Sequence, residues 1–208
     1  MSSMTEPLYP LLSIARLRIG TDGIGVTTLV AGGGCPLHCR WCINAHLLRE
    51  APAESVSAEE LLNRVRIDDL YFRATGGGVT FGGGESLLHA EFIRSFRAIC
   101  PPDWHISVET SLAVSAASVR TAAEAVDEFI IDCKDTNPER YAAYTGGDGT
   151  LMLSNLRLLL DTVGSERVLV RVPLIPQYNT PEQQAKNAEV LQKMGVTRVN
   201  LFSYVIRS

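Results

Sequence analysis

Short apolar segments rich in β-branched residues alternate along the chain with longer segments of helical periodicity. The apolar segments predict six strands, at residues 26–31, 78–81, 105–109, 128–132, 167–174 and 198–202. The intervening periodicity predicts helices at 39–49, 58–66, 87–99, 113–125, 151–163 and 181–194. Ser57 with Glu60 forms a candidate capping box, and Thr180 before Pro181 is a favourable helix start. This alternation predicts a parallel sheet with right-handed crossovers.

Polar residues follow the predicted strands where each one ends. Such residues converge at one mouth in a barrel, whereas an open doubly wound sheet gathers them at one switch point. We therefore expect an α/β fold: a partial, TIM-like (β/α)6 barrel, as a single domain over residues 19–208 after a lead-in at 1–18. The residues in question are Gly82, Gly83, Gly84, Glu85, Glu109, Asp132, Lys134 and Arg171.

Composition narrows the classes of function. Of the 208 residues, 46% are hydrophobic and 20% charged, as in ordinary globular proteins. Nineteen basic against twenty-three acidic residues give a net charge of −4, which disfavours binding to nucleic acid. No apolar run approaches the ~18 to 20 residues of a membrane helix, and residues 1–10 lack the pattern of a secretory signal. We expect a cytoplasmic monomer that contacts neither nucleic acid nor membrane.

The five cysteines are distributed unevenly. Cys35, Cys39 and Cys42 form a C-x3-C-x2-C cluster directly after the first predicted strand. An odd count with one tight cluster points to a reducing compartment and a metal rather than to disulfides. Cys100 and Cys133 are isolated in apolar surroundings and are expected to be small core residues.

Three thiolates at this spacing can bind one 4Fe-4S cluster and leave its fourth iron without a protein ligand. A substrate or cofactor could then bind that iron and receive an electron. The alternative is structural zinc with His38 or His46 as fourth ligand. Zinc sites usually pair two short Cys/His hooks, and the sequence offers no second hook.

The cysteine motif, with Trp41 just before its third cysteine, resembles the radical S-adenosylmethionine (radical SAM) superfamily. Within it, residues 76–85 (GGGVTFGGGE) are similar to the glycine-rich signature of the glycyl-radical-enzyme activating enzymes. The Asp132-Cys133-Lys134 strand end, the Tyr144-Thr145-Gly146 triplet and residues 171–176 also fit that branch, and the similarity runs from about residue 19 to residue 204.

The resemblance implies a 4Fe-4S cluster on the three cysteines and S-adenosylmethionine on its open iron. Reductive cleavage would give a 5′-deoxyadenosyl radical that abstracts a glycine Cα hydrogen from a partner glycyl-radical enzyme, with flavodoxin or ferredoxin as electron donor. Cofactor contacts would come from Trp41, Gly83, Gly84, Glu85, Glu109, Asp132, Lys134 and Arg171. Asp22 would lie near the partner.

Several positions depart from the family pattern. Glu109-Thr110-Ser111-Leu112 stands where relatives have Asp-Thr-Asn-Gly, which puts a monovalent cation site at Glu109, Thr110 and Asp132 in doubt. Residues 22–27 keep Asp22 but lose an arginine, and residues 200–205 lack a family histidine. The chain is short, which suggests a minimal enzyme or a truncation. Residues 43–75 hold no further cysteine, so no second ferredoxin-like unit is expected there.

Other interpretations remain open. Asp132 and Lys134 would share one face of a strand and could form a simple salt bridge. Arg171 could pair with Glu109 or Asp132 instead of a ligand carboxylate. The whole protein could be a radical SAM enzyme for a small molecule, or a non-catalytic iron–sulfur or zinc module.

Overall fold

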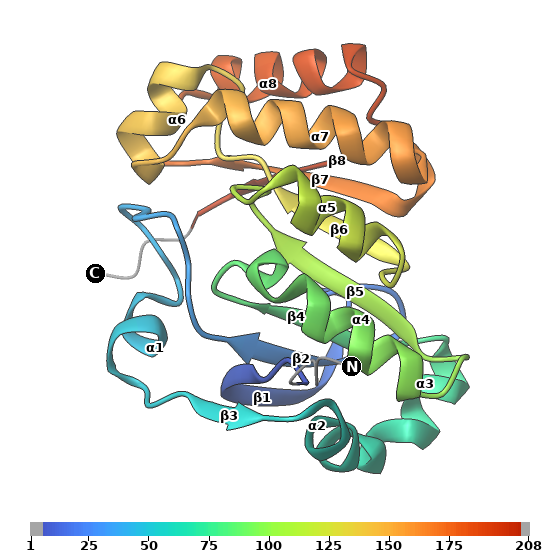
Figure 1. Cartoon of the computed structure of the whole chain (residues 1–208). Coiled ribbons are helices and arrows are strands. Elements are labelled where there is room, and N and C mark those ends of the chain that lie inside the picture. The colour runs from blue at the N-terminus through green and yellow to red at the C-terminus, as the bar shows by residue number, and fades with distance from the viewer. Residues whose placement is uncertain (1–5, 205–208) are drawn as a thin grey trace.

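The computed structural model describes residues 6–204, and one mixed sheet runs through it (Figure 1). The eight strands follow the order β3-β1-β2-β4-β5-β6-β7-β8. Their bounds are β1 Tyr9–Ile19, β2 Val26–Gly32, β3 Glu54–Val56, β4 Gly78–Gly83, β5 His105–Thr110, β6 Glu128–Asp132, β7 Val168–Leu174 and β8 Arg198–Ser203.

The six strands from β2 through β4 to β8 are the predicted ones, and each pairs in parallel with the next. Helices cover one face of the sheet, and the other face forms the concave interior (Figure 1). The predicted partial barrel is confirmed. Parallel strands bring their carboxyl ends to one rim, which places the loops after β2, β4, β5 and β6 near one another.

Residues 9–18, expected as part of a lead-in, instead belong to strand β1 of the same sheet. β1 pairs antiparallel with β2 and with β3, a short strand that the sequence also did not suggest. Two register shifts interrupt the pairing of β1 with β2, and Leu17 has a φ of 55°. These irregularities break the strict apolar–polar alternation that identifies a strand in a sequence. Residues 1–5 of the expected lead-in lie outside the described residues.

The helices are α1 Ala45–Glu50, α2 Ala58–Val65, α3 Asp69–Thr75, α4 Ala90–Ile99, α5 Ala116–Ala123, α6 Pro138–Thr145, α7 Gly149–Val163 and α8 Pro181–Lys193, with 3-10 turns η1 Arg66–Asp68, η2 Ser86–His89 and η3 Ser165–Arg167. Both predicted caps are present. Ser57 and Glu60 cap α2 reciprocally, and Thr180 does so with Gln183 at α8, where Pro181 takes the first helical position.

The sequence mispredicted three helical regions, one of which is α3, a seven-residue helix that was not expected. The helix expected at 39–49 is confined to α1, because the segment before it is the extended cysteine loop. Helix α6 was also not expected, because it is only eight residues long. Asn137 caps its start, and Gly146, with a φ of 70°, ends it.

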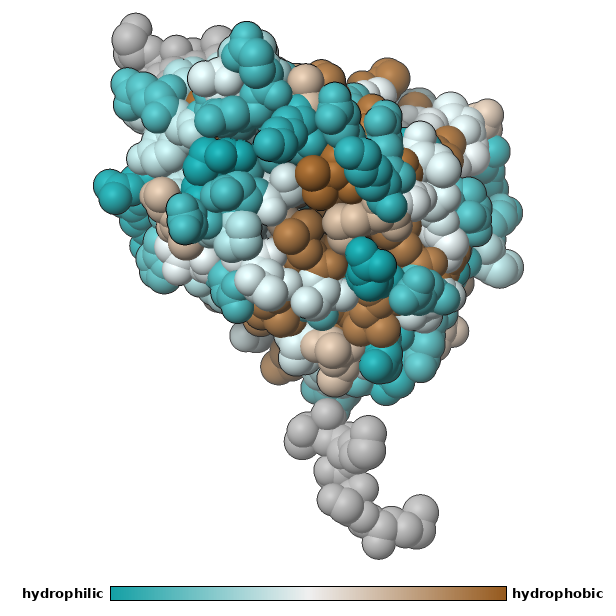
Figure 2. All heavy atoms as spheres, turned by 90° about the horizontal axis from the view of Figure 1, so that it is seen from above, coloured by the Kyte–Doolittle hydropathy of each residue, from teal (hydrophilic) through white to brown (hydrophobic). Residues whose placement is uncertain are grey.

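The core lies between the sheet and its helices and contains Trp104, Phe81 and Phe129. Cys100 and Cys133 are buried within it, as expected. The outer surface over α6, α7 and α8 is mostly hydrophilic, with hydrophobic residues gathered near its middle (Figure 2). Within residues 6–204, no helix has the length and apolar character needed to cross a bilayer.

Candidate active site

The three clustered cysteines lie on the loop between β2 and α1. Cys35, Cys39 and Cys42 are half-buried, and none forms a disulfide. The pKa of Cys39 is raised to about 11, chiefly by burial; Lys134 opposes the rise, and the neighbouring Cys35 and Cys42 contribute to it. Loading a metal here must drive proton release, because iron binds the thiolate.

No three Cys, His, Asp or Glu side chains within residues 6–204 gather closely enough to hold one ion. His46 extends from α1 into solvent and contacts Glu50 at 3.0 Å. Cysteines that each bind a different iron of one cluster lie farther apart than ligands of a single ion, so wider spacing is compatible with a cluster.

The end of α6 fixes the cysteine loop through its backbone. The amide of His38 donates to the carbonyl of Thr145 at 2.7 Å, and the amide of Arg40 donates to that of Tyr144 at 3.1 Å. The Tyr144 hydroxyl donates to the carbonyl of Trp41 at 3.1 Å. In Figure 1 the loop rises from β2 to the side of α6. These contacts give the Tyr144-Thr145-Gly146 triplet a physical role, which is to position the segment that carries the cysteines.

The glycine turn after β4 supports the other side of the same loop. The amides of Gly84 and Glu85 donate to the carbonyls of Gly32 at 3.0 Å and Gly34 at 2.9 Å. A Cβ at position 84 would lie 2.1 Å from the Gly34 oxygen, so only glycine fits. Asn44, two residues after Cys42, donates through Nδ2 to the carbonyl of Gly83 at 2.7 Å. Asn44 was not predicted as a site residue, although its place close to the third cysteine in the sequence was a signal.

The Glu85 carboxylate is 2% exposed and holds the turn to the end of β5. Its Oε1 accepts from the Leu87 amide at 3.1 Å and from the Thr110 hydroxyl at 2.5 Å. Its Oε2 accepts from the amide and the hydroxyl of Ser111 at 2.9 and 2.6 Å. The carboxylate therefore has four donors in the protein. We infer that any contribution of residues 83–85 to a cofactor comes from their backbone carbonyls rather than from this side chain.

Asp132 and Lys134 share a face at the end of β6, as their spacing predicted. Lys134 Nζ lies 2.9 Å from Asp132 Oδ2 and 3.0 Å from the hydroxyl of Tyr204, which follows β8 and was not identified from the sequence. Burial alone would lower the pKa of Lys134, but Asp132 and Tyr204 outweigh it and the pKa is raised well above its usual range. The site thus keeps a buried ammonium at neutral pH.

Glu109 and Arg171 form an ion pair inside the barrel, with Nη1 and Oε1 2.7 Å apart. Of the interpretations left open for Arg171, the structure shows pairing with Glu109. Burial raises the pKa of Glu109, and the guanidinium opposes that rise. A Cβ at Gly82 would come within 2.9 Å of Glu109 Oε2, so this glycine leaves room for the carboxylate. A monovalent cation at Glu109 stays a prediction, and Arg171 already supplies a positive charge there.

Two predicted site residues differ in their surroundings. Trp41 is 38% exposed on the cysteine loop. Asp22, expected near the partner, is 4% exposed, and its side chain pairs with Arg18. The Asp22 carbonyl accepts a hydrogen bond from the Thr80 hydroxyl inside the barrel. The turn between β1 and β2 is thereby fixed into the barrel interior, with the Asp22 carboxylate already paired.

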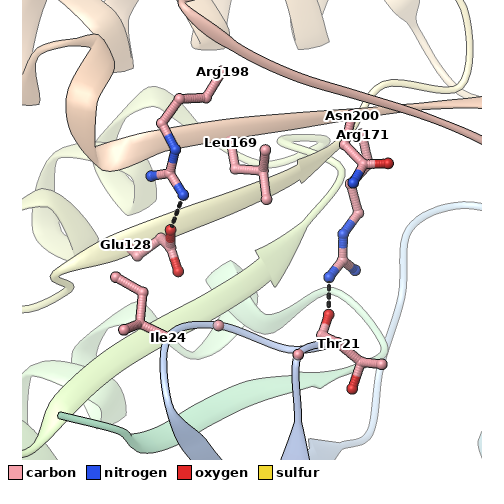
Figure 3. Close-up of a pocket in the computed structure, with 9 residues that line it drawn as sticks. Thr21, Ile24, Glu128, Leu169, Arg171, Arg198 and Asn200 are labelled. Carbon is pink, nitrogen blue, oxygen red and sulfur yellow. Dashed lines mark hydrogen bonds and ion pairs between the residues drawn. The ribbon is translucent and has the colours of Figure 1, made fainter. Parts of the chain in front are cut away.

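A cavity of about 120 Å³ lies beside that turn, under β6, β7 and β8 (Figure 3). Its charged side chains are paired: Arg198 lies 2.6 Å from Glu128, and Arg171 donates to the carbonyl of Thr21. None of the three clustered cysteines lines it. The charged side chains that line the cavity are thus engaged with the protein itself.

The residues present fit an iron–sulfur cluster with S-adenosylmethionine. Three unbridged thiols stand on one loop, the buried Lys134 ammonium acts electrostatically on Cys39, and the glycine turn brings backbone close to the loop. The hydroxyl of Tyr141 is also fully buried near Cys39 with no hydrogen-bond partner within residues 6–204. An orphaned donor in such a place is explained by a group that the protein itself does not supply.

Comparison with known sequences gives one family and a consistent set of relatives. The profile of the radical SAM superfamily matches residues 29–206. The pyruvate formate-lyase 2-activating enzyme of Escherichia coli is 29% identical over 216 aligned positions, which cover 88% of this chain and 73% of that protein. The pyruvate formate-lyase-activating enzyme of Clostridium pasteurianum is 28% identical, with coverage of 88% and 77%. The choline trimethylamine-lyase activating enzyme of Oleidesulfovibrio alaskensis is 28% identical, with coverage of 79% and 72%.

Solved structures share the fold at lower sequence identity. Streptococcus suis SuiB bound to S-adenosylmethionine superposes with a TM-score of 0.65 at 12% identity, and methylornithine synthase with 0.60 at 13%. The matched regions cover 84% and 82% of this chain, but only 39% of SuiB and 50% of the synthase. These matches bear on the fold alone.

Proposed function

This chain belongs to the radical SAM superfamily, and on that premise we propose that it is an activating enzyme that installs a glycyl radical on a partner enzyme. The observation that carries the proposal is the identity of its curated relatives. Two pyruvate formate-lyase activating enzymes each match 88% of the chain, and an activating enzyme for another lyase matches 79%. The site supports the same conclusion, because its motifs meet at one rim of the barrel.

Cys35, Cys39 and Cys42 would hold a 4Fe-4S cluster. When bound, the cluster and S-adenosylmethionine together supply one-electron chemistry that yields a radical able to abstract hydrogen from carbon. The protein keeps the cysteine loop in place from two sides, through the end of α6 and through the glycine turn. Because backbone hydrogen bonds form both supports, the loop is positioned before any group binds.

Lys134 and Asp132 would bind the polar parts of the cofactor. The Lys134 ammonium is 8% exposed and remains charged, so it can attract a carboxylate strongly. Asp132 keeps one oxygen that Lys134 does not contact, and its side chain is 34% exposed, so it can accept from ribose hydroxyls. Arg171, which is in register with Asp132 on the neighbouring strand, pairs with Glu109, and the two would maintain a polar wall beside the cofactor.

The open barrel suits a protein substrate. β3 and β8 stand at opposite ends of the strand order and do not pair with each other, so the barrel is not closed within residues 6–204. Such an opening can admit a loop of a partner protein, whereas a small substrate favours an enclosed pocket. An electron must also come from another protein, and we propose a reduced flavodoxin or ferredoxin for that role.

The test is anaerobic. The chain is reconstituted with iron and sulfide, reduced, and mixed with S-adenosylmethionine and a candidate glycyl-radical enzyme. We expect a carbon-centred doublet in the electron paramagnetic resonance (EPR) spectrum, which disappears when the acceptor glycine is replaced by alanine. The contrary result has two parts: no candidate enzyme acquires a radical, and 5′-deoxyadenosine forms when a metabolite is added instead of a partner protein. That result would contradict the proposal and support a small-molecule substrate.

A further inference from the structure

Tyr141 is buried beside the cysteine loop with an unsatisfied hydroxyl. The residue lies in the middle of α6 and is 0% exposed. Its hydroxyl has no hydrogen-bond partner within residues 6–204. A buried hydroxyl without a partner costs roughly 1 to 3 kcal/mol by mutational data, so such groups are rare unless they have a function.

The ring of Tyr141 and the cysteine loop both lie next to Gly147. An added Cβ on Gly147 would meet the ring of Tyr141 at 3.5 Å and the side chain of Leu37 at 2.3 Å. The ring therefore lies close to Leu37, which stands between Cys35 and Cys39. The carbonyl of Tyr141 accepts from the Thr145 hydroxyl at 2.8 Å, and the Thr145 carbonyl accepts from the loop amide of His38. One turn of α6 thus connects Tyr141 to the cysteine loop.

The electrostatic surroundings of the hydroxyl are consistent with its place beside the cysteine loop. Burial raises the pKa of Tyr141 most, and among the charges Cys39 has the largest effect, ahead of Cys133 and Lys134. Cys39 also packs against the same hydrophobic core that contains Tyr141. The ring thus lies beside Leu37, two residues before Cys39, and its buried hydroxyl makes no hydrogen bond within residues 6–204.

We propose that the Tyr141 hydroxyl donates a hydrogen bond to a sulfur on the Cys39 side of the loaded iron–sulfur cluster and raises the reduction potential of that cluster. The inference rests on the proposed function in one respect, which is that Cys39 holds the cluster. A hydrogen bond to sulfur stabilises the more negative, reduced form, and such bonds are among the factors that set cluster potentials. Tyr141 is then a tuning residue, which acts on electron entry and not on the partner.

The test compares Tyr141→Phe with Tyr9→Phe. Tyr9 is a matched control because it is also 0% exposed. It differs from Tyr141 in that its hydroxyl donates to the Val30 carbonyl and in that burial alone raises its pKa. The midpoint potential of each reconstituted protein is measured by an EPR-monitored redox titration without S-adenosylmethionine or partner. We expect a more negative midpoint for Tyr141→Phe than for the unmodified chain and no change for Tyr9→Phe. An unchanged or more positive midpoint for Tyr141→Phe would overturn the proposal.

A second measurement separates tuning from a merely structural role. Without the cluster, Tyr141→Phe removes a hydroxyl that has no partner, so the apoprotein should unfold at the same or a higher denaturant concentration. A destabilised apoprotein with an unchanged midpoint indicates a structural role and overturns the inference. Electron–nuclear double resonance on the reduced cluster should show a coupling to a proton that is lost when the buffer is exchanged into D2O. The same coupling should be absent from Tyr141→Phe.

If Tyr141→Phe fails to retain the iron–sulfur absorption, 3-fluorotyrosine incorporated at position 141 keeps the ring and makes its hydroxyl a stronger donor. The midpoint should then move to a more positive value, and an unchanged midpoint overturns the proposal. No partner protein enters these measurements, so a wrong partner assignment leaves them intact. Absence of an iron–sulfur cluster in the unmodified chain would instead contradict the proposed function.

Discussion

Gly84 packs against the carbonyl of Gly34 so closely that a Cβ at position 84 would lie 2.1 Å from that oxygen. The two glycines join the end of β4 to the cysteine loop. Gly84→Ala should therefore displace the loop and destabilise the apoprotein by about 1 to 3 kcal/mol, the usual cost of overpacking. Chemical denaturation measures the free energy of unfolding, and the iron content after reconstitution reports on the cysteine loop. Both values should be lower than in the unmodified chain.

Gly33→Ala is the matched control for that change. A Cβ at Gly33 would meet Pro10 at 3.5 Å, an ordinary contact, and its φ is not in the left-handed region. We expect nearly normal stability and iron content. If both alanine variants behave alike, close packing at Gly84 is not what fixes the loop.

Glu85 should matter for stability before any cofactor binds. Its carboxylate accepts from Leu87, Thr110 and Ser111, and Glu85→Gln would turn an NH2 group toward some of these donors. We expect a loss of about 2 kcal/mol in the free energy of unfolding of the apoprotein. Glu59→Gln, on the exposed side of α2, is the control and should have little effect. A neutral Glu85→Gln would show that the four hydrogen bonds do not support the fold.

Lys134→Met should change stability in a pH-dependent way. The folded-state pKa of Lys134 is raised, because Asp132 and Tyr204 outweigh burial. The stabilisation it contributes is fully present below the unfolded pKa of about 10.4 and is lost as pH rises through the folded pKa. We expect the variant to be less stable by about 1 to 2 kcal/mol at pH 7 to 9. This loss is smaller than the usual cost of breaking a fully buried ion pair, because Asp132 is partly exposed.

That difference should shrink above about pH 10.4. Urea unfolding of both proteins at several pH values measures it. A difference that stays constant into the alkaline range, or that grows there, would mean that Lys134 acts through packing rather than charge.

The cysteine assignment predicts a selective loss of iron. Cys39→Ser should lower the iron bound after reconstitution, because one of the three proposed ligands is lost. Cys100→Ser should leave the iron content unchanged, since Cys100 is buried at the end of α4, away from the loop. Equal iron content in the two variants would contradict the ligand set.

The parallel half of the fold could be predicted from the sequence because each strand there is buried and bounded by turn residues. The Glu128–Asp132 strand has the predicted bounds. The antiparallel part could not, since its irregular pairing in Tyr9–Ile19 removes the alternation on which a prediction depends. The extended cysteine loop was mistaken for helix because its residues have helical spacing, although their contacts are with α6 and β4.

The site was predictable to the extent that its residues lie close together in sequence. The pair of Asp132 and Lys134 follows from period-two geometry on one strand. Tyr204 and Tyr141 reach the site from distant elements, and nothing in their local sequence indicates it. The buried Glu85 carboxylate accepts hydrogen bonds from Thr110 and Ser111 at the end of β5. These residues are distant in sequence, and only the fold brings them close to Glu85.

The central claim is that Cys35, Cys39 and Cys42 leave one iron of a 4Fe-4S cluster free to bind S-adenosylmethionine. The most direct measurement is electron–nuclear double resonance on the reduced cluster with S-adenosylmethionine carrying nitrogen-15 in its amino group. The account predicts a nitrogen-15 coupling that appears only with the labelled compound, together with a changed EPR spectrum. An intact reduced cluster whose spectrum is the same with and without saturating S-adenosylmethionine, and which shows no nitrogen-15 coupling, would contradict it.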